Sequence, residues 1–289
     1  TLTRNEMRFV KFVIDGKMYP VLATEGEDSK RFAGVLGGAK PVQVSRDNAL
    51  VTALKTPQGQ KSKEMEFLRC LATCHTVVRE STGNYRAESP DELALLEGLA
   101  VFKCSLLERT TSNLVVDMLG TRSEYQIIGV NAFTASRKRM SIVCRDVFSG
   151  IFYCMCKGAD SAMLDLCNLT TVSRQKVDKN LLDLAMLGLR TLCIAHKKMS
   201  EAEVKRWLAQ YKEAASSMRD RNGALHRVAC EVERDMKLLG ITAIEDRLQD
   251  EVPEVIRDLT NAGVIVWMLT GDKEETAVQI GQSCNLVHE

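Results

Sequence analysis

Residues 237–284, KLLGITAIEDRLQDEVPEVIRDLTNAGVIVWMLTGDKEETAVQIGQSC, carry the clearest fold signal in this chain. The runs 237–244 and 264–269 are almost continuously apolar, as strands buried on both faces are. Residues 251–263 between them have helical spacing, and we expect Asp250 to cap this helix and Gly263 to end it. Strand, helix, strand, loop and helix in this order predict a parallel sheet, and so part of a doubly wound α/β unit.

The residues before position 237 predict an antiparallel α+β body instead. The run MRFVKFVI, the turn Asp15-Gly16 and the run KMYPVL form a hairpin pattern, and Ser149-Gly150 joins two further strands in the same way. The expected strands are 125–133, 140–148, 151–158 and 191–199, and the expected helices are 63–78, 174–188 and 200–219. Residues 25–48 are polar and rich in glycine, which predicts a loop.

The composition excludes two classes of protein. The 289 residues include 39 Lys and Arg against 38 Asp and Glu, a net charge of +1, and 45% are hydrophobic. A chain this apolar with so little net charge can bury a core, so it is not disordered. Without a basic excess, the charge gives no argument for binding nucleic acid.

No stretch of the sequence predicts a membrane span. The longest apolar-leaning stretch, 181–196, contains Asp183 and Arg190 and falls short of the ~20 apolar residues that a bilayer requires. The N-terminal residues TLTRNEMRF lack the apolar core of a signal peptide. Because the first residue is Thr rather than Met, we expect a fragment of a longer protein.

Ten cysteines are scattered along the chain without a C-x-x-C pair, which favours reduced thiols in a cytosolic setting. Cys70, Cys74 and His75 have helical spacing, and two interpretations are open: a metal site, or small buried side chains. The second is favoured because no fourth ligand is evident. Cys154 and Cys156 point to one face of an expected strand and are predicted to pack there.

The tetrapeptide Ser89-Pro90-Asp91-Glu92 predicts the start of another helix. Ser at the N-cap, Pro at the first helical position and Glu at the third define a capping box, with the apolar run LALLEGLAVF behind it. The sequence therefore gives Glu92 a structural role.

The loop after residues 264–269 is a candidate anion site. In open α/β sheets, ligands bind at the carboxyl ends of strands, beside helix N-termini. Thr270 and Gly271 offer a hydroxyl and backbone N–H groups, and Lys273 adds a positive charge. Alternatively, Thr270-Gly271-Asp272 is only a strand-to-helix turn in which Asp272 is the N-cap.

Three further positions suit a phosphorylated ligand, and each has a structural alternative. Lys157, beside Gly158 at a strand end, is either a solvated tip or a phosphate contact. Phe133 is either a core aromatic or a face for an adenine ring, and Arg137-Lys138-Arg139 is either a solvated run or a polyphosphate clamp. Arg190 lies in an apolar run and requires either a carboxylate partner or a phosphate ligand.

Taken together, these segments resemble the phospholipid-transporting (type IV) P-type ATPases, the lipid flippases, over nearly the whole chain. Residues 1–7, TLTRNEM, look like the tail of the family's DKTGTLT-x-N-x-M segment. The segments that follow in the family's order are EFLRCLATCHTVV, YRAESPDELALL, FTASRKRMS, KGADSAM, LRTLCIA, LLGITAIEDRLQDEVPE and VWMLTGDKEETAVQIGQSC. The pattern IEDRLQD points to the lipid branch, since cation pumps usually show a DPPR-type segment there.

The resemblance implies two domains. An α+β antiparallel-sheet nucleotide-binding domain, residues 11–236, would be inserted into an α/β haloacid-dehalogenase-like (Rossmann-type) phosphorylation domain. Of the latter, this chain would hold residues 1–10 and 237–289.

The resemblance also implies a nucleotide site. Phe133 would stack on adenine, Glu92 would lie beside the base, Lys157 would line the ATP pocket and Arg190 would reach the phosphates. Asp246 is a further candidate near the domain junction.

At the phosphorylation site, the resemblance places Thr270, Gly271 and Asp272, with Thr270 steadying the transferred phosphoryl group. The aspartate that accepts this group would lie four positions before Thr1. The magnesium-binding aspartates, the actuator domain and the membrane helices would also lie outside the sequence, so no metal ligand is expected within it. One departure is Ala135, where the family often has Ser, which puts one polar contact in doubt.

The implied function is the ATP-binding cytoplasmic portion of an integral membrane enzyme. The full enzyme would use ATP and Mg²⁺, form an aspartyl-phosphate and move a phospholipid between leaflets, with an accessory subunit as a further partner; the fragment alone would be inactive. Two other classes remain open. A stand-alone phosphatase of the haloacid-dehalogenase type needs a nucleophilic Asp near its N-terminus, but the first one here is Asp15, in a hairpin turn. A non-catalytic scaffold would keep the fold without binding nucleotide.

Overall fold

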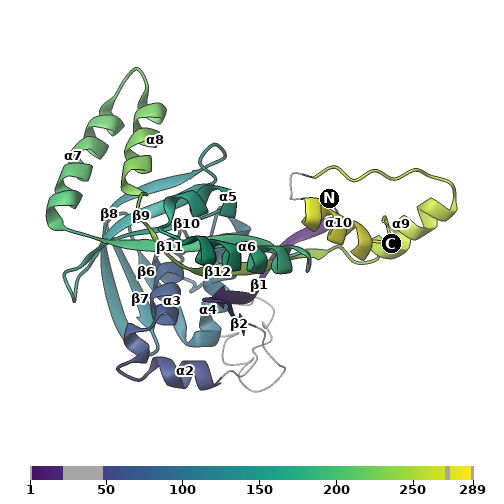
Figure 1. Ribbon diagram of the computed structural model, residues 1–289, viewed down its shortest axis with the longest axis horizontal. Helices are drawn as coiled ribbons and strands as arrows, with labels where there is room; N and C mark the ends of the chain where they lie inside the picture. The colour runs from purple at the N-terminus through teal and green to yellow at the C-terminus, as the bar shows by residue number, and fades with distance from the viewer. Residues whose placement is uncertain (1, 22–47, 271–273, 288–289) are drawn as a thin grey trace.

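The computed structural model describes residues 2–21, 48–270 and 274–287 (Figure 1). The loop expected at 25–48 lies outside these residues except for its last position, where α2 (Asn48–Leu54) begins. The described residues form one large sheet with helices on both faces, and a C-terminal pair of helices that stands beyond the ends of two strands (Figure 1).

A nine-stranded sheet is the centre of the fold, and every neighbouring pair of its strands is antiparallel. In spatial order the strands are β2 (Lys17–Pro20), β1 (Thr3–Ile14), β12 (Lys237–Leu248), β11 (Arg190–Met199), β10 (Phe152–Gly158), β9 (Arg139–Asp146), β8 (Thr121–Thr134), β7 (Asn113–Met118) and β6 (Cys104–Arg109). A separate two-stranded ribbon pairs β4 (Val78–Arg79) with β5 (Tyr85–Arg86). The predicted antiparallel α+β body is confirmed.

Helices cover both faces of the sheet and bury a hydrophobic cluster under each. On one face lie α3 (Lys63–Thr73) and α4 (Pro90–Leu99), with the 3₁₀ turns η1 (Gly59–Lys61) and η2 (Ala100–Phe102). On the other face lie α5 (Asp160–Met163), η3 (Leu164–Leu166), α6 (Thr171–Ala185), α7 (Glu201–Ser216) and α8 (Arg221–Val232). Phe12 of β1 anchors the first cluster, since its ring stacks 4.9 Å from that of Phe67 and 4.8 Å from that of Tyr19.

The local turn and cap signals act where the sequence places them. Asp15 and Gly16 both have positive φ, +51° and +82°, the combination that a two-residue hairpin between twisted strands requires. The turn brings Ile14 opposite Lys17.

The cysteines named in the sequence analysis are packed in the interior. Cys70, Cys74 and His75 are buried with bonds to backbone carbonyls, and Cys154 and Cys156 pack in the second cluster, as the packing interpretation predicts.

The C-terminal segment corrects the prediction of a parallel sheet. β12 contains the run 237–244, but it pairs antiparallel with β1 on one edge and with β11 on the other. Residues 264–269, expected as a buried strand, are instead irregular, and Ile265, Trp267 and Leu269 are exposed. The physical reason is that both edges of β12 are already paired over 241–244, which leaves no free edge there to accept them.

The helices around this segment show two further differences. The helix α9 (Val252–Asn261) ends close to Gly263, as expected. Gly263 lies just after it and has a φ of +82°. The N-cap is Glu251 without a side-chain bond, whereas the predicted cap, Asp250, pairs with Arg4. α10 (Glu274–Ser283) is confirmed, and α8, which projects beside α7 away from the sheet in Figure 1, is a helix that the sequence analysis missed.

Candidate functional site

The strand register gathers most of the predicted site residues at one end of the sheet. Thr134 of β8 lies opposite Arg139 of β9, which lies opposite Gly158 of β10, which in turn lies opposite Cys193 of β11. Phe133 and Lys157 therefore end their strands at the same edge. Arg190 begins β11 there and pairs with Ile244, so Asp246 follows on the same side of β12.

Lys157 and Glu92 form a buried ion pair at this sheet end. Glu92 is 6% exposed, and its Oε1 lies 2.9 Å from Lys157 Nζ. Its Oε2 accepts hydrogen bonds from the backbone N–H and the hydroxyl of Thr76, at 2.9 and 2.7 Å. The carboxylate is thus held by three donors from two residues, Lys157 and Thr76, in a place from which water is largely excluded.

The capping box is only half formed, because Glu92 faces this ion pair. The Ser89 hydroxyl accepts the N–H of Glu92 at 3.4 Å, as the pattern predicts. The reciprocal bond of a capping box would return from Glu92 to Ser89, but here the Glu92 carboxylate binds Lys157 and Thr76 instead. The sequence pattern therefore identified the helix start correctly and misassigned the Glu92 side chain.

The charge state of this buried group is set by its partners. Burial alone would raise the pKa of Glu92, but the Lys157 ammonium and the bonds from Thr76 outweigh burial and lower it. Nearby, burial lowers the pKa of His75 to about 3, and Arg109 and Lys157 act in the same direction. At neutral pH the sheet end thus holds an ionised Glu92 and an uncharged His75.

Arg190 lies between two carboxylates. Its Nη2 is 3.5 Å from Asp91 Oδ2, and its Nη1 is 4.0 Å from Asp246 Oδ2. This satisfies the carboxylate alternative for Arg190 and connects the first turn of α4 to the end of β12. Because 40% of the Arg190 side chain stays exposed, this residue is partly accessible from solvent.

Phe133 is exposed rather than part of the core. It is 62% exposed, so the interpretation of Phe133 as a core aromatic is wrong. A flat aromatic side chain that is left open beside charged groups is suited to stack on another flat ring.

The three cations after Phe133 have different environments. Arg137 and Arg139 are buried and bind the two oxygens of Glu233, with Arg139 Nε at 2.7 Å from Oε2. Lys138 is exposed, with a φ of +51°. Neither the solvated run nor the three-cation clamp describes this turn, in which Lys138 alone of the three points its charge to solvent.

Glu233 is a residue that the sequence analysis missed. It follows α8, a helix whose mixed pattern gave no clear amphipathic signal, and nothing in the local sequence separates Glu233 from the nearby charged residues. Its importance comes only from contacts with residues more than 90 positions earlier.

The phosphorylation-site residues are described only in part. Thr270 lies in exposed, irregular chain between α9 and α10, a segment that stands beyond the ends of β1 and β12 in Figure 1 rather than at the sheet end just described. Gly271, Asp272 and Lys273 lie outside the described residues.

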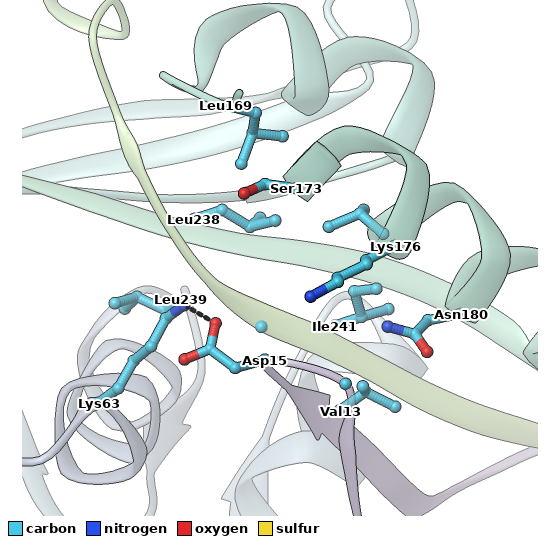
Figure 2. Close-up of a pocket in the computed structure, with 13 residues that line it drawn as sticks. Val13, Asp15, Lys63, Leu169, Ser173, Lys176, Asn180, Leu238, Leu239 and Ile241 are labelled. Atoms are coloured by element: carbon cyan, nitrogen blue, oxygen red, sulfur yellow. Dashed lines mark hydrogen bonds and ion pairs between the residues drawn. The ribbon is translucent and has the colours of Figure 1, made fainter. Parts of the chain in front are cut away.

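Figure 2 shows a cavity of about 320 Å³ in another part of the molecule. It lies between α6, the hairpin at Asp15 and β12, with Lys63 and Lys176 on its walls. None of the predicted site residues lines it. Among the described residues, no group of three or more His, Cys, Asp or Glu side chains is arranged to hold a metal ion, and none of the helices described has both the length and the apolarity to cross a bilayer.

Comparison with known families places this chain in a class of domain. Residues 63–251 match the family described as P-type ATPase, cytoplasmic domain N, and the chain belongs to this family.

Its relatives are phospholipid-transporting ATPases, which confirms the resemblance seen in the sequence. The chain is 36% identical to phospholipid-transporting ATPase IC of Xenopus tropicalis over 303 aligned positions, 38% identical to phospholipid-transporting ATPase DRS2 of Saccharomyces cerevisiae over 299, and 39% identical to phospholipid-transporting ATPase C887.12 of Schizosaccharomyces pombe over 296. All of this chain is covered in each alignment, but it spans only 22–23% of these relatives.

Proposed function

We propose that this chain binds ATP at the sheet end where β8, β10, β11 and β12 present Phe133, Lys157, Arg190 and Asp246. The observation that carries the proposal is the exposed ring of Phe133 beside exposed Lys138 and at the same edge as the buried Lys157–Glu92 pair. Membership of the family supports it independently.

Each residue has a role in this proposal that its environment permits. Phe133 stacks on the adenine ring, with Lys157 and Glu92 forming the polar wall beside the base. Arg190 and Lys138 are the accessible cations that meet phosphate oxygens, a role for which guanidinium and ammonium groups are suited. Mg²⁺ is expected to arrive bound to the nucleotide phosphates, because this ion is commonly held by substrate phosphates in ATP-using proteins.

We further propose that β1 and β12 lead from the nucleotide-binding domain, residues 11–236, into a haloacid-dehalogenase-like phosphorylation domain to which residues 1–10 and 237–289 contribute. The proposed boundary after residue 10 falls within β1, and the one after residue 236 falls just before β12. The two strands pair with each other from Val13 opposite Ile241 to Thr3 opposite Leu248, so the two segments run side by side. Thr270, Gly271 and Asp272 belong to the phosphoryl site of that domain. Its chemistry is phosphoryl transfer to a carboxylate, which depends mainly on positioning and charge stabilisation.

The whole protein, in this proposal, is a membrane enzyme that couples ATP hydrolysis through an aspartyl-phosphate to phospholipid movement between leaflets. This chain is part of its cytoplasmic portion. The support is that the relatives named above are phospholipid-transporting ATPases. The lipid, the membrane and an accessory subunit engage the parent protein through segments other than those described here.

The test of ATP binding is a calorimetric titration of the wild type, Phe133→Ala and Phe148→Ala. Base–aromatic stacking contributes about 1–3 kcal/mol, so Phe133→Ala is expected to weaken binding by about fivefold to a hundredfold. Phe148 is a matched control because it is a fully exposed Phe in the β9–β10 turn, at the opposite end of both strands. Equal losses in the two variants, or none in either, would contradict the stacking role.

A further inference from the structure

Glu233 stands at the centre of a buried polar cluster that joins α8 to the turn between β8 and β9. Its side chain is fully buried. Its Oε1 binds Arg137 Nη2 and accepts the Ser141 hydroxyl at 2.6 Å, and its Oε2 accepts Arg139 Nε at 2.7 Å. Asn131 extends the cluster, since its Nδ2 donates to Ser141 Oγ at 2.9 Å.

A cluster of this kind has a large desolvation cost. Two guanidinium groups and one carboxylate have been removed from water, and well-packed apolar side chains are often at least as stabilising as such groups. Stability alone therefore gives little reason to place three charges here. The directions in which Arg137 and Arg139 make their remaining bonds indicate what else the cluster does.

Arg137 connects Glu233 to the backbone that carries Phe133. While its Nη2 binds Glu233, its Nη1 donates to the carbonyl of Ala132, the residue before Phe133, at 3.0 Å. Arg139 Nη1 donates to the carbonyl of Arg137 at 3.2 Å. One carboxylate thus fixes both ends of the turn at Thr134–Lys138.

The same turn is joined to the strand end that carries Lys157. The N–H of Ala159 donates to the carbonyl of Lys138 at 2.9 Å. Gly158 permits this close approach, because a Cβ at that position would lie 2.4 Å from the Cβ of Arg139 and 2.6 Å from the Lys138 carbonyl oxygen. The position of the turn relative to Lys157 is therefore set by contacts with almost no freedom.

We propose that Glu233 is a positioning residue for the nucleotide site: through Arg137 it holds Phe133 and Lys138 at a fixed place relative to Lys157. It touches no ligand itself. The inference rests on the proposed nucleotide binding and adds to it a residue, on the separate α7–α8 hairpin, whose contribution is geometric. A positioned ring and ammonium bind more tightly than mobile ones because less side-chain and loop freedom is lost on binding.

The decisive variant is Arg137→Lys, which separates positioning from stability. A lysine can keep the ion pair with Glu233, but its single nitrogen replaces the two Nη atoms that bind Glu233 and the Ala132 carbonyl separately, so we expect the bond to Ala132 to be lost or lengthened. Two controls accompany it. Leu114→Ala removes a buried side chain from β7 and destabilises the fold without touching the turn, and Arg227→Lys makes the same substitution at an exposed ion pair of α8.

Affinity for ATP is measured by calorimetry, melting temperature by calorimetric scan, and exchange of the Lys138 amide, which bonds the Thr134 carbonyl, by NMR. Arg137→Lys is expected to lower affinity about tenfold and to speed Lys138 exchange at least tenfold with a small change in melting temperature. Leu114→Ala is expected to lower the melting temperature. Both Leu114→Ala and Arg227→Lys should leave the ATP affinity and the Lys138 exchange rate within twofold of the wild type.

Two results would overturn the inference: unchanged affinity and exchange in Arg137→Lys, or losses of affinity that follow melting temperature in all variants. Glu233→Gln is a second test, since it keeps the volume and removes the charge; it should reproduce both losses where the variant folds. If the wild type binds no ATP, the proposed function fails, while the exchange measurement still decides whether Glu233 and Arg137 order the turn.

Discussion

At the scale of single residues, the buried pair of Glu92 and Lys157 is expected to be sensitive to substitution. Both side chains are almost fully buried and 2.9 Å apart, so removing one charge leaves the other without compensation. The Thr76 bonds to Glu92 survive an exchange of carboxylate for amide, and the ionic contact does not.

We therefore expect Glu92→Gln to lower the free energy of unfolding by about 3 kcal/mol, the lower part of the range for breaking a buried pair. Ser89→Ala is the matched comparison, since it removes only the N-cap bond of the same helix and costs about 1 kcal/mol. Urea unfolding at pH 7 measures both. A Glu92→Gln protein within about 0.5 kcal/mol of the wild type would show that the pair contributes little.

The two buried histidines predict a loss of stability in mild acid. Burial lowers the pKa of His75 to about 3 and that of His196 to about 4, whereas both are near 6.5 when unfolded. Below pH 6.5 the unfolded chain binds protons that the folded chain does not, so stability falls as the pH drops from about 6.5 toward 4. The Glu66 carboxylate, 3.7 Å from His196, opposes this shift, and Lys237, Lys198 and Arg69 reinforce it.

The expected slope is up to about 1.4 kcal/mol per pH unit for each histidine. His75→Gln should reduce the slope of unfolding free energy against pH between 6 and 4.5 by up to that amount. His226, an exposed histidine of α8, provides the matched His→Gln control, and the difference between the slopes of the two variants isolates the effect of burial at His75. Identical slopes in all three proteins would mean that His75 is protonated in the folded state.

At the scale of elements, the two tryptophans distinguish a packed helix from an open segment. Trp207 of α7 is 4% exposed and donates its Nε1–H to the Val228 carbonyl at 3.3 Å, whereas Trp267 is 84% exposed in the irregular stretch after α9. Trp207→Ala should cost about 3–5 kcal/mol. Trp267→Ala should change the free energy of unfolding by less than about 0.5 kcal/mol.

Acrylamide quenching gives an independent reading of the same pair. Trp267 should be quenched freely and Trp207 should not. The fluorescence of each is measured alone, Trp267 in Trp207→Ala and Trp207 in Trp267→Ala. Strong protection of Trp267 would show that residues 264–269 are covered by another part of the molecule, contrary to their exposure here.

The elements that sequence could predict are those specified by local chemistry. The Asp15-Gly16 hairpin needs only two residues that accept positive φ, and the start of α4 needs only Ser89 and Pro90. The run 264–269 was predicted wrongly because an apolar run shows that a segment prefers burial but not which neighbour is present to bury it. The parallel pairing predicted for 237–244 was wrong for the same reason. The apolar pattern of β12 was correct, but its antiparallel partners are β1, near the N-terminus, and β11, the strand before it along the chain.

Some residues of the candidate site could be predicted from local sequence, and others could not. Phe133 and Lys157 were selected from their positions at strand ends, and Arg190 from its place in an apolar run. The strand register brings all three to one end of the sheet. Glu233 could not be selected, because its role depends on an ion pair with Arg137, 96 residues earlier, and no local pattern marks such a pair. The contacts of the Glu92 side chain could not be predicted either, because a Glu at this position can complete a capping box or form a buried ion pair.

At the scale of the whole molecule, the helices on the two faces of the sheet bring different side chains to the same sheet end. α3 and α4 bring the Glu92 helix start to the sheet end from one face, and α7 and α8 bring Glu233 to it from the other. The sheet between them fixes both to the same strand ends. A nucleotide site at this edge thus uses both helical layers, while α9 and α10 stand apart beyond β1 and β12 (Figure 1).

Mapping ATP binding by NMR tests the central claim most directly, because the molecule offers a competing location. The cavity of about 320 Å³ between α6 and β12 has Lys63 and Lys176 on its walls and is large enough for a small ligand (Figure 2). Titration of the wild type with ATP should shift the amides of Phe133–Lys138, Lys157–Ala159 and Asp91 and leave those of Lys176 and Asn180 unmoved. Shifts that cluster around Lys176, Asn180 and Gly240, with the Phe133 turn unchanged, would contradict the account.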